Sequence, residues 1–523
     1  MREKDEVAGE AWGFQVRSVR LQGRHTREGG GPSAAMPRTG FLPATTSRLP
    51  APLPTSRGDG DEAGSSPASA NARSVAYAEI ATLAEARGLR LIRRFWSRGA
   101  SMVRLKVLGG GRRVGKTALL VEGSKTRLLL DYGVDISGAE PEFPLHVRPR
   151  DLDFIVITHA HLDHSGAAPF LYVSAKPKLY CTRLTLELSD VLIADFLKLS
   201  KYYIPYEYGQ VEEMKSGAVE VGVSDEVEER GVVLRFWNAG HIPGSVMTEI
   251  EIEGKTILYT GDFNTVDTCL LSGAELEPFE RADVVVMEGT YALFNHPPRE
   301  EVERAFVNDV LEVLDAGGNV LVPAFAVGRA QEILCVLAKH RVRYPVYVDG
   351  MARRVNSLLL ENLNALRDPD FARKALTSAI QVNGRRDRER ALEQPSVIVS
   401  PAAMLKGGAS IHYVKELIED RRNAIFFVSY VMRETPARKL LETGILELET
   451  LKKKAAARIE WYDFSSHCGK RELLSALEKL DAKAKLVIVH CEEEGGKRLA
   501  EEAARSYEIK TYSPSEGETL EFD

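Results

Sequence analysis

Three histidines and an aspartate crowd into six positions of the chain, directly after a short apolar run. The stretch FIVITHAHLDH spans residues 154–164, and the whole chain has 11 histidines in 523 residues. The apolar residues 154–157 predict a short buried strand, so the three histidines and the aspartate lie just after the end of that strand. Imidazole nitrogens and carboxylate oxygens in this arrangement suit zinc and are tolerable for manganese or iron. We therefore expect a metal site in preference to a surface histidine cluster, with the candidate ligands His159, His161, Asp163 and His164.

Further ligands must come from elsewhere, because zinc takes about four ligands per ion. His241 lies in the turn NAGHIPGS after the apolar run 232–237, and Asp262 ends the run ILYTGDF (257–263). His490 follows the run LVIV at 486–489. A lone histidine at the end of a strand is more often structural. Together, however, these residues repeat one arrangement, in which a predicted strand is followed by a ligand in the next loop.

The order of these motifs resembles that of metallo-β-lactamase-fold hydrolases. Asp131 follows a predicted strand, then come the H-x-H-x-D-H loop, a single histidine and an aspartate. The resemblance implies an αββα sandwich that begins with a β-hairpin and holds two zinc ions. Asp131 would orient a ligand or the attacking water instead of binding an ion. The implied ligands are His159, His161, His241 and Asp262 for the first ion, and Asp163, His164, His490 and the shared Asp262 for the second.

Five further segments narrow the resemblance to the β-CASP nucleases. They are VVVMEGTY (284–291), VPAFAVGRAQEIL (322–334), VYVDGMA (346–352), FSSHCGK (464–470) and VIVHCEE (487–493). The pattern is most similar to the nuclease subunit of the cleavage and polyadenylation specificity factor and its archaeal relatives. It implies an α/β fold in which a β-CASP cap, residues 294–457, interrupts a metallo-β-lactamase domain made of residues 102–293 and 458–523. In the cap we expect helices at 300–316, 328–340 and 411–420, and strands at 319–323 and 345–349.

Hydrolysis of a phosphodiester also needs a proton for the leaving oxygen. His467 is the predicted acid, and Glu288 is its predicted partner, which would raise the pKa of the imidazole and fix its tautomer. A structural histidine at the hinge of the cap is the alternative for His467. Arg329 and Arg438 are predicted phosphate contacts, although surface salt bridges would explain both equally well.

The resemblance implies a zinc-dependent ribonuclease that cuts single-stranded RNA internally, in 3′-end processing or turnover. A 5′→3′ exoribonuclease of the ribonuclease J type stays open. A DNA-repair nuclease is a weaker alternative, since such proteins usually lack a histidine where His490 stands, and the metal site alone does not separate RNA from DNA. A non-catalytic scaffold would have lost ligands, whereas this chain keeps the whole set. Both a homodimer and an RNA-processing complex stay open as assemblies.

Another motif points to a different class of protein. GGRRVGKT, residues 110–117, fits the phosphate-binding loop of nucleotide-binding proteins. That loop must leave a strand and open a helix. Here the residues that follow are two short apolar runs split by Gly123 and Ser124, which predict a β-hairpin. We therefore expect a strand-to-strand bend without nucleotide binding.

The composition indicates the class of protein and its location in the cell. Hydrophobic residues make up 44% of the chain and charged residues 28%, which is ordinary for a soluble globular protein. No apolar run approaches the roughly 20 residues of a membrane helix. Five scattered cysteines without C-x-x-C pairing suggest a reducing compartment, so a cytoplasmic location is expected.

Charge is distributed unevenly along the chain. The net charge is −6, of which residues 1–101 carry +5, so the remainder is acidic and any contact with nucleic acid must depend on local sites. Residues 1–101 are rich in Gly, Ser, Pro and Ala and predict a disordered or non-native leader.

Overall fold

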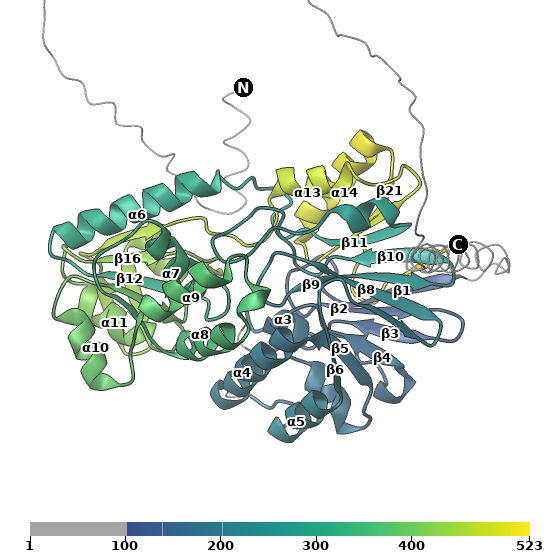
Figure 1. Cartoon of the computed structure of the whole chain (residues 1–523), viewed down its shortest axis with the longest axis horizontal. Helices are drawn as coiled ribbons and strands as arrows, with labels where there is room; N and C mark the ends of the chain where they lie inside the picture. The colour runs from purple at the N-terminus through teal and green to yellow at the C-terminus, as the bar shows by residue number, and fades with distance from the viewer. Residues whose placement is uncertain (1–101, 139, 201) are drawn as a thin grey trace, which may run out of the picture. The chain divides into compact units, whose positions relative to one another are not determined.

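The computed structural model describes residues 102–138, 140–200 and 202–523, all of which belong to one compact unit (Figure 1). The leader predicted for residues 1–101 lies outside the described residues. Within the described ranges, no helix is both long and apolar enough to cross a bilayer.

The first of two large sheets contains the predicted N-terminal hairpin. Strand β2 (Ala118–Glu122) pairs antiparallel with β3 (Arg127–Leu130) from Leu119 opposite Leu130 to Glu122 opposite Arg127. β3, β4 (Phe154–Val156), β5 (Lys178–Thr182) and β6 (Ala218–Val221) then run parallel to one another. The order across this sheet is β22 (Thr519–Phe522), β1 (Val103–Gly109), β2 (Ala118–Glu122), β3 (Arg127–Leu130), β4 (Phe154–Val156), β5 (Lys178–Thr182) and β6 (Ala218–Val221).

The second sheet also has seven strands and joins distant parts of the chain. Its strands β10 (Lys255–Tyr259), β11 (Val284–Glu288) and β20 (Lys485–Val489) run parallel, although β20 follows β11 by nearly two hundred residues. The order is β21 (Lys510–Tyr512), β20 (Lys485–Val489), β11 (Val284–Glu288), β10 (Lys255–Tyr259), β9 (Val246–Ile252), β8 (Val232–Asn238) and β7 (Glu226–Glu229).

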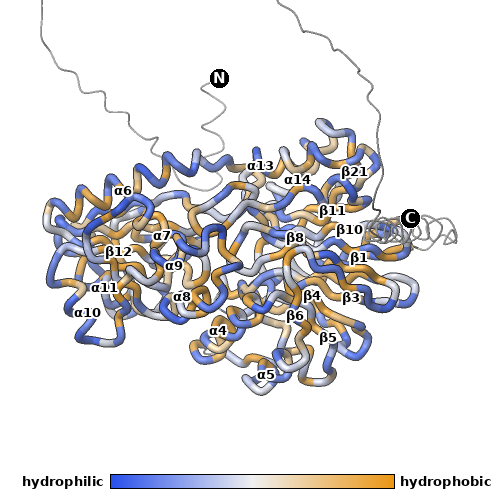
Figure 2. The backbone as a smooth tube through the Cα atoms, viewed as in Figure 1, coloured by the Kyte–Doolittle hydropathy of each residue, from blue (hydrophilic) through white to orange (hydrophobic). Residues whose placement is uncertain are grey.

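These two sheets pack face to face, and helices cover their outer faces. Fully buried side chains from both sheets, such as Leu128 and Ile250, form one apolar cluster between them. The outer face of the first sheet packs against α4 (Arg183–Leu199) and α5 (Tyr208–Ser216). The outer face of the second packs against α13 (Lys470–Leu477) and α14 (Glu493–Tyr507). Hydrophobic residues accordingly concentrate along the strands in Figure 2, and the predicted αββα layering is confirmed.

A third, all-parallel sheet forms the centre of the cap. Both faces of this sheet are buried, as is usual for parallel sheets. Its order is β14 (Ile380–Gln381), β13 (Val346–Val348), β15 (Val397–Pro401), β12 (Val320–Ala324), β16 (Ala424–Phe427) and β19 (Arg458–Trp461).

The cap helices cover both faces of this sheet, so the predicted α/β cap is confirmed (Figure 1). The three predicted helices and two predicted strands all occur, with ends within three residues of those expected. The helices are α6 (Arg299–Asp315), α7 (Arg329–Lys339), α8 (Met351–Glu361) and α9 (Pro369–Ser378) on one face, and α10 (Arg385–Leu392), α11 (Ser410–Leu417) and α12 (Pro436–Thr443) on the other.

The domain boundaries at 293/294 and 457/458 stay a prediction. Strand β19 (Arg458–Trp461) pairs with β16 of the cap sheet. We therefore propose that the chain returns to the metallo-β-lactamase domain after Trp461, four residues later than the sequence suggested.

The glycine-rich stretch 110–117 is a bend between two strands. β2 begins at Ala118, directly after Thr117, so no helix follows the motif. The ammonium group of Lys116 lies 3.3 Å from a carboxylate oxygen of Glu142 and 3.2 Å from one of Glu516. The motif therefore lacks both the helix and the free lysine that a phosphate-binding loop requires.

Candidate metal centre

The ends of several neighbouring strands bring the predicted site residues together. β3 is parallel to β4, and β10, β11 and β20 are parallel to one another, so the carboxyl ends within each group share one sheet edge. Ligands commonly bind at such edges in α/β folds. The residues that end or follow these strands and β8 are Asp131 after β3, His159 after β4, His241 after β8, Asp262 after β10, Glu288 at the end of β11 and His490 after β20.

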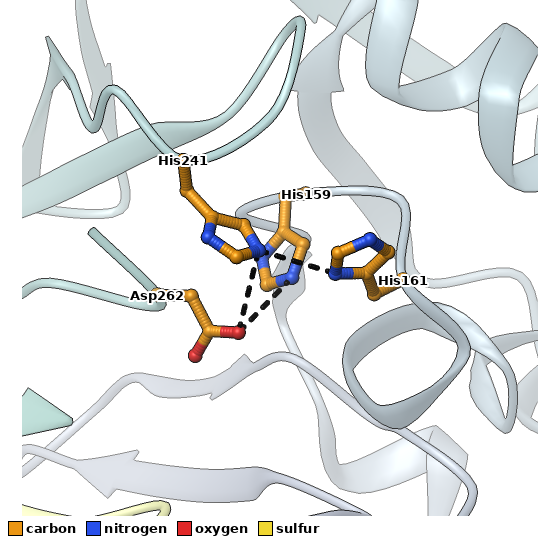
Figure 3. Close-up of side chains that lie close together, drawn as sticks. All are labelled: His159, His161, His241 and Asp262. Atoms are coloured by element: carbon orange, nitrogen blue, oxygen red, sulfur yellow. Dashed lines mark hydrogen bonds and ion pairs between the residues drawn. The ribbon is translucent and has the colours of Figure 1, made fainter. Parts of the chain in front are cut away.

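The first predicted ligand set forms one cluster. Its four ligand atoms, from His159, His161, His241 and Asp262, lie within 4.8 Å of one another. Asp262 Oδ2 is 3.5 Å from His159 Nε2 and 3.6 Å from His241 Nε2. His241 Nε2 is 3.2 Å from His161 Nδ1, and Figure 3 shows the three imidazoles pointing toward one another beside the carboxylate.

The second predicted set lies against the first. Asp163, His164 and His490 also have their ligand atoms within 4.8 Å of one another. Both Asp163 and His164 belong to the short helix α3 (Leu162–Ser165), which begins directly after His161. Asp262 Oδ1 lies 3.3 Å from His164 Nε2 and 3.1 Å from His490 Nδ1. Asp262 thus directs one oxygen toward each set, the arrangement expected of a bridging carboxylate.

Hydrogen bonds on the far side of two imidazoles decide which nitrogen faces the centre. His164 Nδ1 lies 2.7 Å from Asp131 Oδ2, so Nε2 remains for the centre. His241 Nδ1 lies 2.9 Å from the carbonyl oxygen of Ser466 and donates to it, which leaves Nε2 inward. Such partners fix the tautomer and orientation of metal-binding histidines.

Asp131 has the environment of an orienting group. Its carboxylate is completely buried and accepts hydrogen bonds from the Thr158 amide at 2.8 Å and the Tyr259 hydroxyl at 2.7 Å. Asp131 and His490 both have positive φ, at 55° and 47°. Backbone in this region is unfavourable for residues with a Cβ, and it persists at sites that the surrounding structure holds firmly.

The protonation state of the first cluster suits a cation. Burial lowers the pKa of His159 and of His241 well below the usual value, and it lowers the pKa of His161 to about 4. Neutral imidazole is the form that binds metals. Burial alone would raise the pKa of Asp262, but the imidazoles of His490 and His164 hold it well below its ordinary value.

An unpaired buried nitrogen indicates that this set of donor atoms fits a metal ion. His159 Nε2 is buried and has no hydrogen-bond partner among the described residues. An unpaired buried nitrogen is costly, and a cation in the centre would satisfy it. For His164, burial would lower the pKa, but Asp262 and Asp131 raise it well above the usual value, so a cation would displace that proton.

The predicted acid and its partner are in contact. His467 Nδ1 lies 2.9 Å from both carboxylate oxygens of Glu288, whose Oε1 also accepts the Phe263 amide at 2.9 Å. Burial would lower the pKa of His467, but the carboxylates of Glu288 and Asp262 raise it to about 9. The ring of His467 lies 4.5 Å from that of His241, so the pair adjoins the first ligand set.

The two arginines predicted to contact phosphate lie in different surroundings. Arg329 is buried at the start of α7 and donates to Ser466 Oγ at 3.3 Å, one residue from His467. Arg438, on α12, is also buried, but its Nε donates to Glu442 of the same helix. Arg329 thus contacts the segment that carries His467, and both arginines stay predicted phosphate contacts.

Comparison with known proteins agrees with this geometry. The β-CASP domain matches residues 330–440, and the metallo-β-lactamase superfamily matches residues 111–309. A domain described as a Zn-dependent metallo-hydrolase RNA specificity domain matches residues 453–514. The chain is 41% identical over 418 residues to RNase aCSPSF2 of Saccharolobus solfataricus, covering 80% of this chain and 85% of that protein.

The chain belongs to the β-CASP family of the metallo-β-lactamase superfamily. It is 35% identical to the Probable RNase MJ4 of Methanocaldococcus jannaschii, over 74% of this chain and 92% of that protein. It is 32% identical to Transcription termination factor FttA of the same organism, over 82% of this chain and 73% of that protein. A crystal structure of an Enterococcus faecalis protein of unknown function shares the fold, with a TM-score of 0.54 at 14% identity, covering 81% of this chain and 100% of that one.

This β-CASP protein also has residues in the centre that sequence reasoning did not select. The amide of Thr117 donates to the carbonyl of Asp163 at 2.7 Å, and its hydroxyl lies 3.1 Å from His490 Nδ1. Tyr259 and Thr158 hold the Asp131 carboxylate. Their positions were the only indication in the sequence: Thr117 directly precedes β2, Thr158 follows β4 and Tyr259 ends β10, but a single hydroxyl at such a position carries little information alone.

Proposed function

We propose that this protein is a two-zinc ribonuclease that hydrolyses phosphodiester bonds inside single-stranded RNA, in 3′-end processing or turnover. The observation that carries the proposal is the pair of ligand clusters that share Asp262. The relatives named RNase, and the match to a Zn-dependent RNA specificity domain, support RNA as the substrate and zinc as the metal. We also propose a cytoplasmic location, while a homodimer and an RNA-processing complex both remain compatible.

Different residues of the chain have separate roles in the proposed reaction. When bound, zinc ions polarise phosphate oxygens and lower the pKa of water to about 7. Asp131 and the Ser466 carbonyl keep His164 and His241 in the orientation that binding requires. His467, held by Glu288 through Nδ1, donates the proton at Nε2 to the leaving oxygen of the RNA.

Arg329 is the group best suited to hold the phosphate in place. Its Nε and Nη1 are buried and make no hydrogen bond within the described part of the chain. Burial and the nearby Arg299 lower the pKa of Arg329 to about 10, so the guanidinium remains charged at neutral pH. Unpaired buried donors are costly, and a phosphate oxygen that arrives next to the Ser466–His467 segment would satisfy them.

We expect Arg329→Gln to lower kcat/KM on RNA by about 10- to 150-fold, the loss typical of one charged hydrogen bond. Arg329→Lys should recover part of that rate, because it restores the charge without the two-pronged geometry. Steady-state kinetics would measure both, together with zinc content and the unfolding midpoint. Arg438→Gln tests the other predicted phosphate contact, whose Nε already donates to Glu442. Unchanged kinetics in Arg329→Gln would contradict the phosphate contact.

The proposed function itself is tested with single-stranded RNA and DNA of one sequence, labelled at either end. An endoribonuclease should release internal fragments from RNA with both labels, and leave DNA largely intact. Mononucleotides released only from the 5′ end would establish exonucleolytic cleavage instead. Equal cutting of DNA would argue for the weaker DNA-nuclease alternative, and no cleavage with bound zinc would overturn the proposal.

One comparison favours the exonuclease as the second candidate. A Methanocaldococcus jannaschii protein named RNase J-like is 31% identical over 435 residues, covering 80% of this chain and 100% of that protein. The stretch HAHLDHSG (159–166) resembles the cleavage-factor branch of the family more, and this resemblance is the reason why we give the endonuclease precedence.

A further inference from the structure

The described residues of the metal centre differ in how far they are exposed to a substrate. His159 and His164 are fully buried, and His241, Asp262 and His490 are each 2% exposed. By contrast, the Asp163 side chain is 33% exposed and that of His467 is 19% exposed. His161 is likewise only partly buried. RNA must therefore approach over the side formed by His161, Asp163 and His467.

An uncovered aromatic ring lies at this opening. Phe325 is 39% exposed, although it comes directly after the fully buried strand β12. Its ring centroid lies 6.5 Å from that of His161, with the two planes inclined by 58°. A single exposed aromatic residue is common on protein surfaces, so its position beside a metal-ligand candidate is what distinguishes Phe325.

The loop that carries Phe325 is held firmly against the core. The Ala330 amide donates to the Phe325 carbonyl at 3.1 Å, and the Gln331 side chain donates to the Ala326 carbonyl at 3.1 Å. Gly328 has a φ of +76°, and a Cβ there would lie 3.0 Å from Ile242, the neighbour of His241. The backbone is thus tightly packed while the phenyl ring remains uncovered, so the ring is presented in a fixed place.

We propose that Phe325 is a stacking platform for the nucleobase next to the scissile phosphate. This inference rests on the proposed ribonuclease function. Every base has an aromatic face, so a phenyl ring binds single strands without reading their sequence. Bases in a duplex stack on one another and are not available to the ring, so Phe325 would favour single-stranded RNA. Arg329 lies four residues further on, so one short segment would hold both a base and its phosphate.

Two RNA oligonucleotides test the platform. One is a single-stranded RNA whose cleavage site has been mapped, and the other is the same RNA with abasic nucleotides on both sides of that site. Phe325→Ala should lower kcat/KM on the intact RNA by about 5- to 150-fold, the effect of losing one stacked base. On the abasic RNA, the wild-type protein should be slow, and Phe325→Ala should equal it.

Other substitutions separate stacking from simple packing. Phe325→Trp should keep the wild-type rate, whereas Phe325→Leu, which preserves apolar bulk without a ring, should behave like alanine. Tyr203→Ala, which removes an 88% exposed ring elsewhere, is the matched control and should change nothing. Zinc content and the unfolding midpoint should match the wild-type values in every variant.

The outcomes distinguish this inference from the proposed function. An equal loss for Phe325→Ala on intact and abasic RNA, or full activity of Phe325→Leu, would overturn the platform and leave the ribonuclease standing. Wild-type protein that leaves the intact RNA uncut would overturn both.

Discussion

Asp262→Asn is expected to lower kcat/KM on RNA by about 10³-fold or more, since a bound metal supplies several kcal/mol of transition-state stabilisation. One oxygen of Asp262 faces His159 and His241, and the other faces His164 and His490. Asparagine keeps the shape but removes the negative charge that both clusters share. Elemental analysis should therefore find about two zinc equivalents in the wild-type protein and clearly fewer in the variant.

The matched control for this substitution lies five residues further along the chain. Asp267 is 54% exposed and pairs with Arg367 at 2.8 Å, outside both clusters. Asp267→Asn should keep full activity and both ions. Full activity with a single equivalent of metal in the wild-type protein would defeat the two-ion proposal. Full activity of Asp262→Asn would show that this carboxylate is not the bridge.

Several of the predicted ligands could be found from the sequence because they follow apolar runs. His159, Asp262 and His490 follow β4, β10 and β20, strands that read clearly as buried. Strand ends that share an edge lie close together, so the apolar pattern singled out these positions, and the resemblance to metallo-β-lactamase-fold hydrolases implied how the ligands divide into two sets.

The partners of those ligands were not visible in the sequence. Tyr259 lies 128 positions from Asp131, and Ser466 lies 225 positions from His241, so each contact depends on how the strands pair and the cap returns. Phe325 was hidden for another reason. It continues the apolar run of β12, in which a phenylalanine is expected to be buried, and its exposure depends on the turn that ends the strand.

The glycine-rich motif shows why a local pattern needs its structural context. Residues 110–117 have the letters of a phosphate loop but the geometry of a bend between β1 and β2. The bend serves the metal centre instead, because the His490 amide donates to the Gly110 carbonyl at 2.8 Å and Thr117 contacts His490. A motif of eight residues does not specify the element that follows it, and here that element is a strand.

His467→Ala is expected to keep both zinc ions while losing about 10²- to 10⁴-fold in rate, the usual contribution of general acid catalysis. The imidazole belongs to neither of the two proposed ligand sets, and Glu288 occupies its Nδ1. Glu288→Gln should show a smaller loss, because glutamine can still accept from Nδ1 but no longer carries a charge. Single-turnover kinetics on RNA, with zinc analysis of each variant, would measure both effects.

His340→Ala is a suitable control for the loss of a histidine paired with a carboxylate. His340 lies 3.3 Å from Glu303 within the cap and is 25% exposed, and among the described residues it belongs to neither ligand cluster. Its removal should leave the rate on RNA unchanged, so a loss specific to His467 cannot be attributed to a general effect of deleting such a pair.

A change of substrate separates the acid from a phosphate-positioning role. A phosphodiester whose leaving group has a low pKa departs without a proton, so it does not need His467. On that ester, His467→Ala should approach the wild-type rate, even though the same variant is slow on RNA. If the variant is equally slow on both substrates while its zinc is intact, the acid role is wrong. The imidazole would then position the phosphate, and Glu288 would orient the imidazole.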